Sequence, residues 1–502
     1  MQKVRIFRNA GMVVAQVVVS GIVLLILFYF LLRTIGAVQV GIWSVVLATA
    51  SAARLSELGL SGGVVKFVAQ YLARPNQNKA GDVVETAALS IAALIGIVLI
   101  PAYPLIGWLL KHILPIASLS EALALLPFAL ASLWITAIGS VFLSGLDGIQ
   151  RIDIRSLVLM ASAGIYLALV VMLVPSHGLV GLAYAQVTQA IIIAVVSWLL
   201  LRRLLPTLPV FPYRWNRELF RGMFSYGLNF QFSSLVQMML DPMTKALLSK
   251  FGGLDAVSYF EMANRMVLQF RSLLVSGNQV IVPVVAGMHE ANPARIPNLY
   301  RDSYSLLLFL ALPIYGGVVA AIPIISELWI GRYEASFVSF ATLLTVGWFS
   351  NTLAGPAYFS NLGTGRLRWN TLSHVTMGLV NGVMGTMLGI MFGSIGVVIG
   401  FVTALFLGSS LVVIAYHMEN RMVSISWLPR DHWRLAIAST FAAGVGWGIY
   451  YFFRDHGGIL LVGFLSTMVF VGLVIPAMWM HPLRSMLIAR IIGQRGKANR
   501  LR

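Results

Sequence analysis

The sequence predicts an all-α polytopic membrane protein with about 14 transmembrane helices, and three observations support this prediction. The chain has 502 residues, of which 59% are hydrophobic and 10% are charged. Soluble domains carry about 25% charged residues. The mean hydropathy of +0.86 indicates many membrane spans over a chain of this length. The apolar residues also fall into stretches of about 20, the length that a helix needs to cross a bilayer.

The first predicted span follows a short basic segment and is retained, because the apolar run continues to about Leu32 without a small-residue cleavage site. Asp82 and Glu85 have the spacing of a capping box, which predicts a helix start there. The predicted spans are 9–32, 38–60, 83–110, 121–146, 156–174, 179–201, 222–249, 255–285, 300–325, 336–361, 369–391, 394–416, 433–453 and 458–480.

The basic residues predict the orientation. About 26 of them lie in one set of loops and in the two termini, and about five lie in the alternate loops. The positive-inside rule then places both termini in the cytoplasm, and the even number of spans agrees. The net charge of +18 is explained by this pattern, so no nucleic-acid partner is expected.

Two segments recur along the chain at one offset. Residues 31–39 resemble residues 247–255, and residues 144–148 resemble residues 360–364, in both cases 216 residues apart. We therefore expect two six-helix lobes related by a pseudo-twofold axis along the membrane normal, with the site between them, and two further C-terminal helices. The predicted domains are a first lobe at 1–205, a cytoplasmic linker at 206–221, a second lobe at 222–420, and two extra helices with a basic tail at 421–502.

Two arginines occupy comparable positions in the predicted repeat. Arg54 plus the offset falls one residue from Arg271. Arginine stays charged and binds phosphate in a bidentate manner, so an arginine pair across a central cleft would suit a diphosphate headgroup. The alternative is local: Arg54 pairs with Glu57 on its own helix, and Arg271 extends to water.

Two acid–base pairs lie in the predicted seventh and eighth spans. Asp241 precedes Lys245 by four residues, and Glu261 precedes Arg265 by four, so each pair shares a helix face. One interpretation is that both pairs are neutralised and specify packing. The other is that Asp241 and Glu261 couple transport to an ion gradient, because intramembrane carboxylates mark ion pathways.

Sequence motifs for catalysis are absent. The chain has no P-loop, no H-E-x-x-H segment and no cysteine, so neither a cofactor nor a metal is expected. No predicted outer loop is large enough to hold an active site. Transport is therefore favoured over an enzymatic function.

Several segments resemble the polysaccharide transporter, or oligosaccharide flippase, family of the multidrug/oligosaccharidyl-lipid/polysaccharide exporter superfamily. They are Phe7-Arg8-Asn9, Gly36-x-x-x-x-Gly41-Ile42-Trp43, residues 57–73, residues 144–151, and Leu240-Asp241 followed by Phe251-Gly252-Gly253. Glu57 departs from the family, in which many members have aspartate there. The resemblance implies a flippase that moves undecaprenyl-diphosphate-linked oligosaccharide across the bacterial inner membrane by alternating access. It implies Arg54, Arg265 and Arg271 as diphosphate ligands, and membrane lipids and polysaccharide assembly proteins as partners.

Four alternatives stay open at this point. The extra C-terminal spans are similar to those of the lipid II flippase branch. Lipid II, the peptidoglycan precursor, therefore stays open as a substrate. A cation-coupled drug antiporter of the same superfamily would hold acids without basic neighbours. A glycan polymerase or ligase would need a sizeable outer loop. A scaffold without transport would leave the buried charges unexplained.

Overall fold

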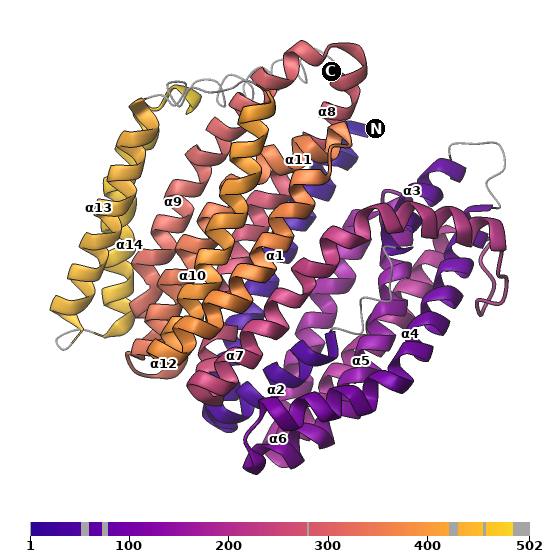
Figure 1. Ribbon diagram of the computed structural model, residues 1–502, viewed down its shortest axis with the longest axis horizontal. Helices are drawn as coiled ribbons and strands as arrows, with labels where there is room; N and C mark the ends of the chain where they lie inside the picture. Colours follow the sequence, from indigo (N-terminus) through magenta and orange to yellow (C-terminus); the bar gives the residue numbers. More distant parts are fainter. Residues whose placement is uncertain are drawn as a thin grey trace. The chain divides into compact units, whose positions relative to one another are not determined.

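The computed structural model describes residues 2–51, 60–72, 79–278, 281–420, 430–454 and 458–484, and over these ranges the chain is helical with no β-strand. The all-α fold predicted from the sequence is confirmed (Figure 1). The helices are α1 (Gln2–Thr34), α2 (Gly36–Ser51), α3 (Leu60–Leu72), α4 (Lys79–Ile113), α5 (Ile116–Gly148), α6 (Ile152–Leu204), α7 (Arg217–Asn278), α8 (Ile281–Ala291), η2 (Pro293–Arg295), α9 (Ile296–Ile330), α10 (Ala335–Leu353), α11 (Gly355–Thr364), α12 (Arg368–Glu419), α13 (Arg430–Phe453) and α14 (Ile459–Met480).

The three longest helices are hairpins. In α6, the side-chain amide of Gln189 donates to the carbonyl of Ser162 at 3.4 Å, although 27 residues of straight helix would separate them by about 40 Å. In α12, the Trp369 indole N–H donates to the Glu419 carboxylate at 2.6 Å, so the two ends of this helix also lie side by side. The chain reverses at Gly178 in α6, at Gly253 in α7 and at Gly393 in α12, where φ is positive. These breaks fall between the predicted spans.

Nine helices of the described ranges are long and apolar enough to cross a membrane. Two of them, α6 and α12, are hairpins with two legs each. Together with the short apolar helix α2 and the two legs of α7, they give the fourteen helical segments that the sequence predicts. Since α7 carries seven charged side chains between residues 241 and 271, its composition alone does not identify it as a membrane span.

The turns of the backbone repeat along the chain. Seven described residues have a positive φ, and six of them form three pairs spaced 215 to 217 residues apart: Gly36 with Gly253, Gln150 with Gly365, and Gly178 with Gly393. The last pair has closely similar dihedrals, φ 54° and ψ −134° at Gly178, φ 62° and ψ −141° at Gly393. The spacing agrees within one residue with the offset of 216 found in the sequence.

The chain forms two compact units. Unit 1 comprises Met1–Glu261 and Asn381–Val397, and unit 2 comprises Met262–Val380 and Val398–Arg502. Unit 1 therefore includes the tips of both the α7 and the α12 hairpins. The two tips pack against each other, because a Cβ added to Gly389 of α12 would lie 2.7 Å from the Phe251 ring of α7. The lobe boundaries predicted from the sequence stay a prediction.

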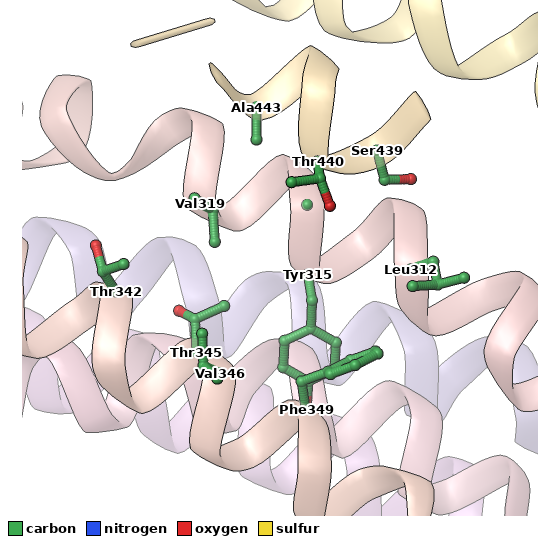
Figure 2. Close-up of a pocket in the computed structure, with 11 residues that line it drawn as sticks. Leu312, Tyr315, Val319, Thr342, Thr345, Val346, Phe349, Ser439, Thr440 and Ala443 are labelled. Carbon is green, nitrogen blue, oxygen red and sulfur yellow. The ribbon is translucent and has the colours of Figure 1, made fainter. Parts of the chain in front are cut away.

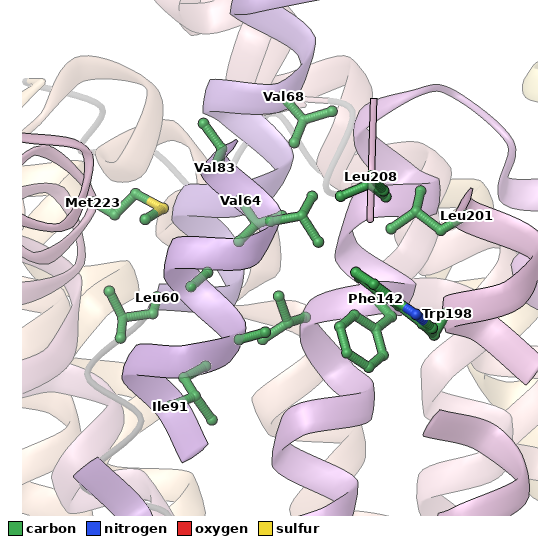
Figure 3. Packing of buried hydrophobic residues seen from close by; sticks show 14 of the residues in the cluster. Leu60, Val64, Val68, Val83, Ile91, Phe142, Trp198, Leu201, Leu208 and Met223 are labelled. Atoms are coloured by element: carbon green, nitrogen blue, oxygen red, sulfur yellow. The ribbon is translucent and has the colours of Figure 1, made fainter. Parts of the chain in front are cut away.

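A hydrophobic core of unit 1 lies where α3, α4, α5 and the second leg of α6 meet. Figure 3 shows Val64, Phe142 and Leu201 among the side chains that fill it, with Leu208 from the segment after α6. In unit 2, α13 and α14 lie beside α9 (Figure 1). The Trp447 indole of α13 donates to the Val319 carbonyl of α9 at 2.7 Å. The two extra helices are thus fixed to the unit by polar as well as apolar contacts.

Two local expectations were wrong. The capping box does not start a helix, because α4 begins earlier, at Lys79, and Glu85 is fully buried. Residues 61–72 lie between two predicted spans and were expected to be a loop, but they belong to the helix α3. Residues 279 and 280 of the predicted span 255–285 lie outside the described residues, and the described part of that span is helical, in α7 up to Asn278 and in α8 from Ile281.

Candidate functional site

Arg271 lies on the second leg of α7, in unit 2. Its Nη2 donates to the Asn351 side-chain oxygen at 2.7 Å. Its guanidinium lies 4.8 Å from the centre of the Trp348 ring, within cation–π range. Its Nε is buried and has no hydrogen-bond partner in the described structure. The side chain is therefore held in place on one side and leaves donor capacity unused.

The groups that hold Arg271 are themselves anchored. The Trp348 indole donates to the Asn264 side-chain oxygen at 2.8 Å, and the Asn351 amide donates to Ser409 at 3.0 Å. These contacts join α7, α10 and α12 within unit 2. Because each partner has a second bond that fixes its rotamer, the guanidinium is preorganised.

Charge balance at this position is unusual. Among the described residues, no carboxylate forms an ion pair with Arg271, and the titratable groups that interact with it are the phenols of Tyr315 and Tyr358. Arginine cannot be deprotonated in a protein, so its charge persists. A desolvated cation without an acid favours an anionic ligand, and phosphate oxygens fit a guanidinium geometrically.

A cavity of about 260 Å³ lies beside this network, between α9, α10 and α13 (Figure 2). Tyr315 forms part of its wall, and the hydroxyl of Tyr315 bonds to Thr352 at 2.7 Å. The remaining lining is mostly apolar and includes Leu312, Val319 and Phe349. The cavity can accept a segment of hydrocarbon next to the polar network.

A second cluster of charges lies in unit 1, at the α7 hairpin. The Lys245 ammonium is 2.7 Å from Asp241 and 2.6 Å from Glu261. Lys245 and Glu261 are buried, whereas the Asp241 side chain is 42% exposed. The sequence paired Asp241 with Lys245 correctly, and the hairpin brings Glu261 to the same ammonium, a contact that helical spacing did not predict.

The other predicted site residues are distributed as follows. Arg265 lies six residues before Arg271 on the same leg of α7, and at 100° per residue the two point to different sides of the helix. Arg54 lies outside the described residues. The structure thus joins the two predicted ion-coupling residues through Lys245, and it does not place Arg265 and Arg271 on one helix face.

Sequence reasoning missed three members of the Arg271 cluster. Asn264, Trp348 and Ser409 were not singled out. The available signal was Trp348 and Asn351, three residues apart in an otherwise apolar span, since this spacing puts an aromatic and an amide on one helix face.

Comparison with known proteins identifies the family of the chain and solved structures that share its fold. The family described as "Polysaccharide biosynthesis protein" matches residues 39–335. The solved structure of the lipid II flippase MurJ, in an inward closed conformation, is similar over 92% of this chain and 97% of its own, with a TM-score of 0.68 and 13% identity. An inward-facing multidrug resistance MATE family transporter of the MOP superfamily covers 83% of this chain and 95% of its own, with a TM-score of 0.65 and 17% identity.

A MOP superfamily transporter from Pyrococcus furiosus is a third similar structure, described as having a binding pocket of reverse polarity. It covers 80% of this chain and 95% of its own, with a TM-score of 0.53 and 18% identity. At these identities the structural matches establish the fold. Comparison with curated proteins gives no match.

Proposed function

The chain belongs to the polysaccharide biosynthesis protein family, a group of transporters in the MOP superfamily, and from this premise we propose that it flips a lipid-linked oligosaccharide. The proposed substrate is an undecaprenyl-diphosphate-linked polysaccharide repeat unit. It is moved from the cytoplasmic to the outer leaflet of the bacterial inner membrane by alternating access, with both termini of the protein in the cytoplasm.

The observation that carries this proposal is the buried guanidinium of Arg271, which has no carboxylate partner in the described structure. A diphosphate supplies the missing negative charge and can accept from the free Nε–H. Arg54 and Arg265 are proposed as further contacts to the same headgroup. The apolar cavity beside Tyr315 supports a lipid anchor, because it offers hydrocarbon-lined space next to the cation.

Lipid II is the second candidate substrate. It shares the diphosphate and the prenyl chain, so the Arg271 argument applies to it equally. The lipid II flippase structure also matches 92% of this chain, and the MATE structure matches 83%; the larger share favours keeping this substrate, although it establishes the fold alone. A drug antiporter is less favoured, because the buried Glu261 carboxylate is paired with Lys245.

The test measures flipping of a fluorescent undecaprenyl-diphosphate oligosaccharide and of lipid II in vesicles that contain the purified protein. We expect Arg271→Ala to lower the rate at least tenfold, Arg54→Ala to lower it less, and the double variant to be slowest. Arg332→Ala is the matched control, because Arg332 is 71% exposed and already paired with Glu334. If both single variants and the double variant flip at the wild-type rate, the arginine assignment fails.

Coupling to an ion gradient through Asp241 and Glu261 is part of the proposal. Lys245 already neutralises these carboxylates, so a cation can bind only when the ammonium moves away. The measurement is the flipping rate with and without an imposed proton or sodium gradient, for the wild type and for Asp241→Asn. If the wild-type flipping rate is the same with and without either gradient, Asp241 and Glu261 do not couple transport to an ion.

A further inference from the structure

The segment after α6 exposes its largest side chains and buries smaller ones. Leu205 and Leu208 are buried in the core of unit 1 (Figure 3). Phe211 is 77% exposed and Tyr213 is 64% exposed, and Val210 and Trp215 beside them are more than half exposed. In water this arrangement is unfavourable, since contiguous exposed apolar groups rimmed by polar residues mark an interaction site.

The exposure is not an effect of a loosely attached loop. The buried carboxylate of Glu85, on α4, accepts the backbone N–H groups of Tyr213 and Arg214 at 3.1 and 3.0 Å. The Trp198 indole donates to the Val210 carbonyl at 2.9 Å, and Thr86 accepts the N–H of Asn216 at 3.2 Å. The backbone is therefore fastened to α4 and α6 while the Phe211 and Tyr213 rings are exposed. The Trp215 indole, which is about half exposed, is also tied to α4, because its N–H donates to Ser90 at 3.0 Å.

The sequence of this segment stiffens it further. Prolines at 206, 209 and 212 fix φ at every third residue, which limits the conformations available to the segment. All of these contacts lie within unit 1. The rings at 211 and 213 are thus presented by a rigid backbone and cannot easily turn inward.

Basic side chains surround the exposed rings. Residues 202–221 contain five exposed arginines and one acid, Glu218. The arginines are Arg202, Arg203, Arg214, Arg217 and Arg221. Exposed aromatic rings are enriched at the headgroup level of membranes, and clustered arginines attract anionic lipids at about 1 kcal/mol per residue, which is about fivefold in affinity.

We propose that residues 202–221 form a membrane-docking surface that binds anionic phospholipid headgroups of the leaflet beside the basic loops. Phe211 and Tyr213 enter the headgroup region, and the arginines contact lipid phosphates around them. Charge complementarity selects lipid as the occupant, because the surface combines interfacial aromatic rings with a strong excess of positive charge. The docking surface holds the first turn of α7 at the membrane, independently of which substrate is transported.

The first test uses the absence of cysteine from the sequence. A spin label is attached at Phe211→Cys and, in a second variant, at Arg366→Cys, an exposed position in another basic loop. Both variants are placed in vesicles prepared with about 30% phosphatidylglycerol. We expect the label at 211 to collide more with membrane-soluble oxygen, and the label at 366 to collide more with a water-soluble nickel complex. Equal access of both labels to the nickel complex would overturn the proposal and point to a soluble partner.

The second test measures the lipid that remains bound. Native mass spectrometry of protein extracted from the same vesicles counts the phosphatidylglycerol molecules retained. We expect Arg217→Gln and Arg221→Gln each to lower the affinity about fivefold, while Arg332→Gln, an exposed arginine in an alternate loop, leaves it unchanged. Equal retention by the Arg217→Gln/Arg221→Gln variant and the Arg332→Gln control would also overturn the proposal. Because neither readout measures flipping, failure here leaves the proposed function untouched.

Discussion

The ammonium of Lys245 lies 2.6 Å from the carboxylate of Glu261, on the opposite leg of the α7 hairpin, and both side chains are buried. The same ammonium reaches Asp241 one turn earlier on its own leg, at 2.7 Å. A single cation therefore compensates two acids and also joins the two legs. Its removal would leave the buried carboxylate of Glu261 without this partner.

Replacement of Lys245 should destabilise the protein strongly. Removing one partner of a buried ion pair costs about 3–5 kcal/mol, because the remaining charge stays desolvated. We expect Lys245→Met to lower the unfolding temperature in detergent, and high salt to leave the wild-type value nearly unchanged, since buried pairs are little screened. Lys250→Met is the control, because Lys250 lies on the same leg but is exposed. Equal unfolding temperatures for the two variants would show that the pair contributes little.

Asn351 offers a test that separates folding from transport. Asn351→Asp keeps the shape of the side chain but places a carboxylate about 2.7 Å from the Arg271 guanidinium. The new ion pair should maintain or raise the unfolding temperature, because the Ser409 hydroxyl, which accepts from the Asn351 amide, can donate to the new carboxylate instead. Flipping should fall at least tenfold, because the guanidinium is then neutralised before the diphosphate arrives. A normal flipping rate in this variant would contradict the role proposed for Arg271.

The hairpin glycines should be sensitive to any side chain. Gly178 and Gly393 have φ and ψ values that residues other than glycine rarely adopt. We expect Gly178→Ala and Gly393→Ala each to cost about 1–3 kcal/mol in thermal or denaturant unfolding. Gly164→Ala is the matched control, since its added Cβ meets nothing within 4 Å and alanine is the better helix former. Unfolding of all three variants at one temperature would refute the strain argument.

Much of the fold could be predicted because its signals are local or periodic. The spans follow from apolar length, and the breaks at Gly178, Gly253 and Gly393 fall between predicted spans. The repeat was also detectable, since equivalent turns need similar backbone geometry at equivalent positions. The helix α3 was missed because its apolar stretch is not long enough to give a membrane-span signal.

The candidate sites were less predictable because their contacts cross between elements. Helical spacing joins Glu261 to Arg265, but only the register of the α7 hairpin brings Glu261 to Lys245. The contacts of Arg271 with Trp348 and Asn351 span about eighty residues of sequence and depend on how α7 packs against α10. The capping-box pattern at Glu85 was misleading, because that carboxylate caps the segment after α6 instead.

Two buried histidines at one end of unit 2 should make its stability depend on pH. The Leu483 N–H donates to His481 Nδ1 at 3.3 Å, so the proton of His481 is on Nε2, which donates to His432 Nδ1 at 2.6 Å. The other nitrogen of His432 then donates to Ser305 of α9 at 3.2 Å. This chain joins α14, α13 and α9, and it requires both rings to be neutral.

An added proton breaks one bond of this chain, because it must bind a nitrogen that now accepts. Burial lowers the pKa of His481, although the nearby Asp431 carboxylate opposes the shift. The folded pKa therefore lies below the unfolded value of about 6.5. The contribution of these hydrogen bonds to stability is complete above the unfolded pKa, and it is lost as the pH falls through the folded pKa.

We therefore expect the unfolding temperature in detergent to fall between pH 7.5 and pH 5.5, and His481→Gln to reduce that fall, because glutamine can still donate to His432 but does not titrate in this range. His177→Gln is the control, since His177 is an exposed histidine in unit 1. If His481→Gln and the wild type lose the same number of degrees on acidification, another group is responsible for the pH dependence.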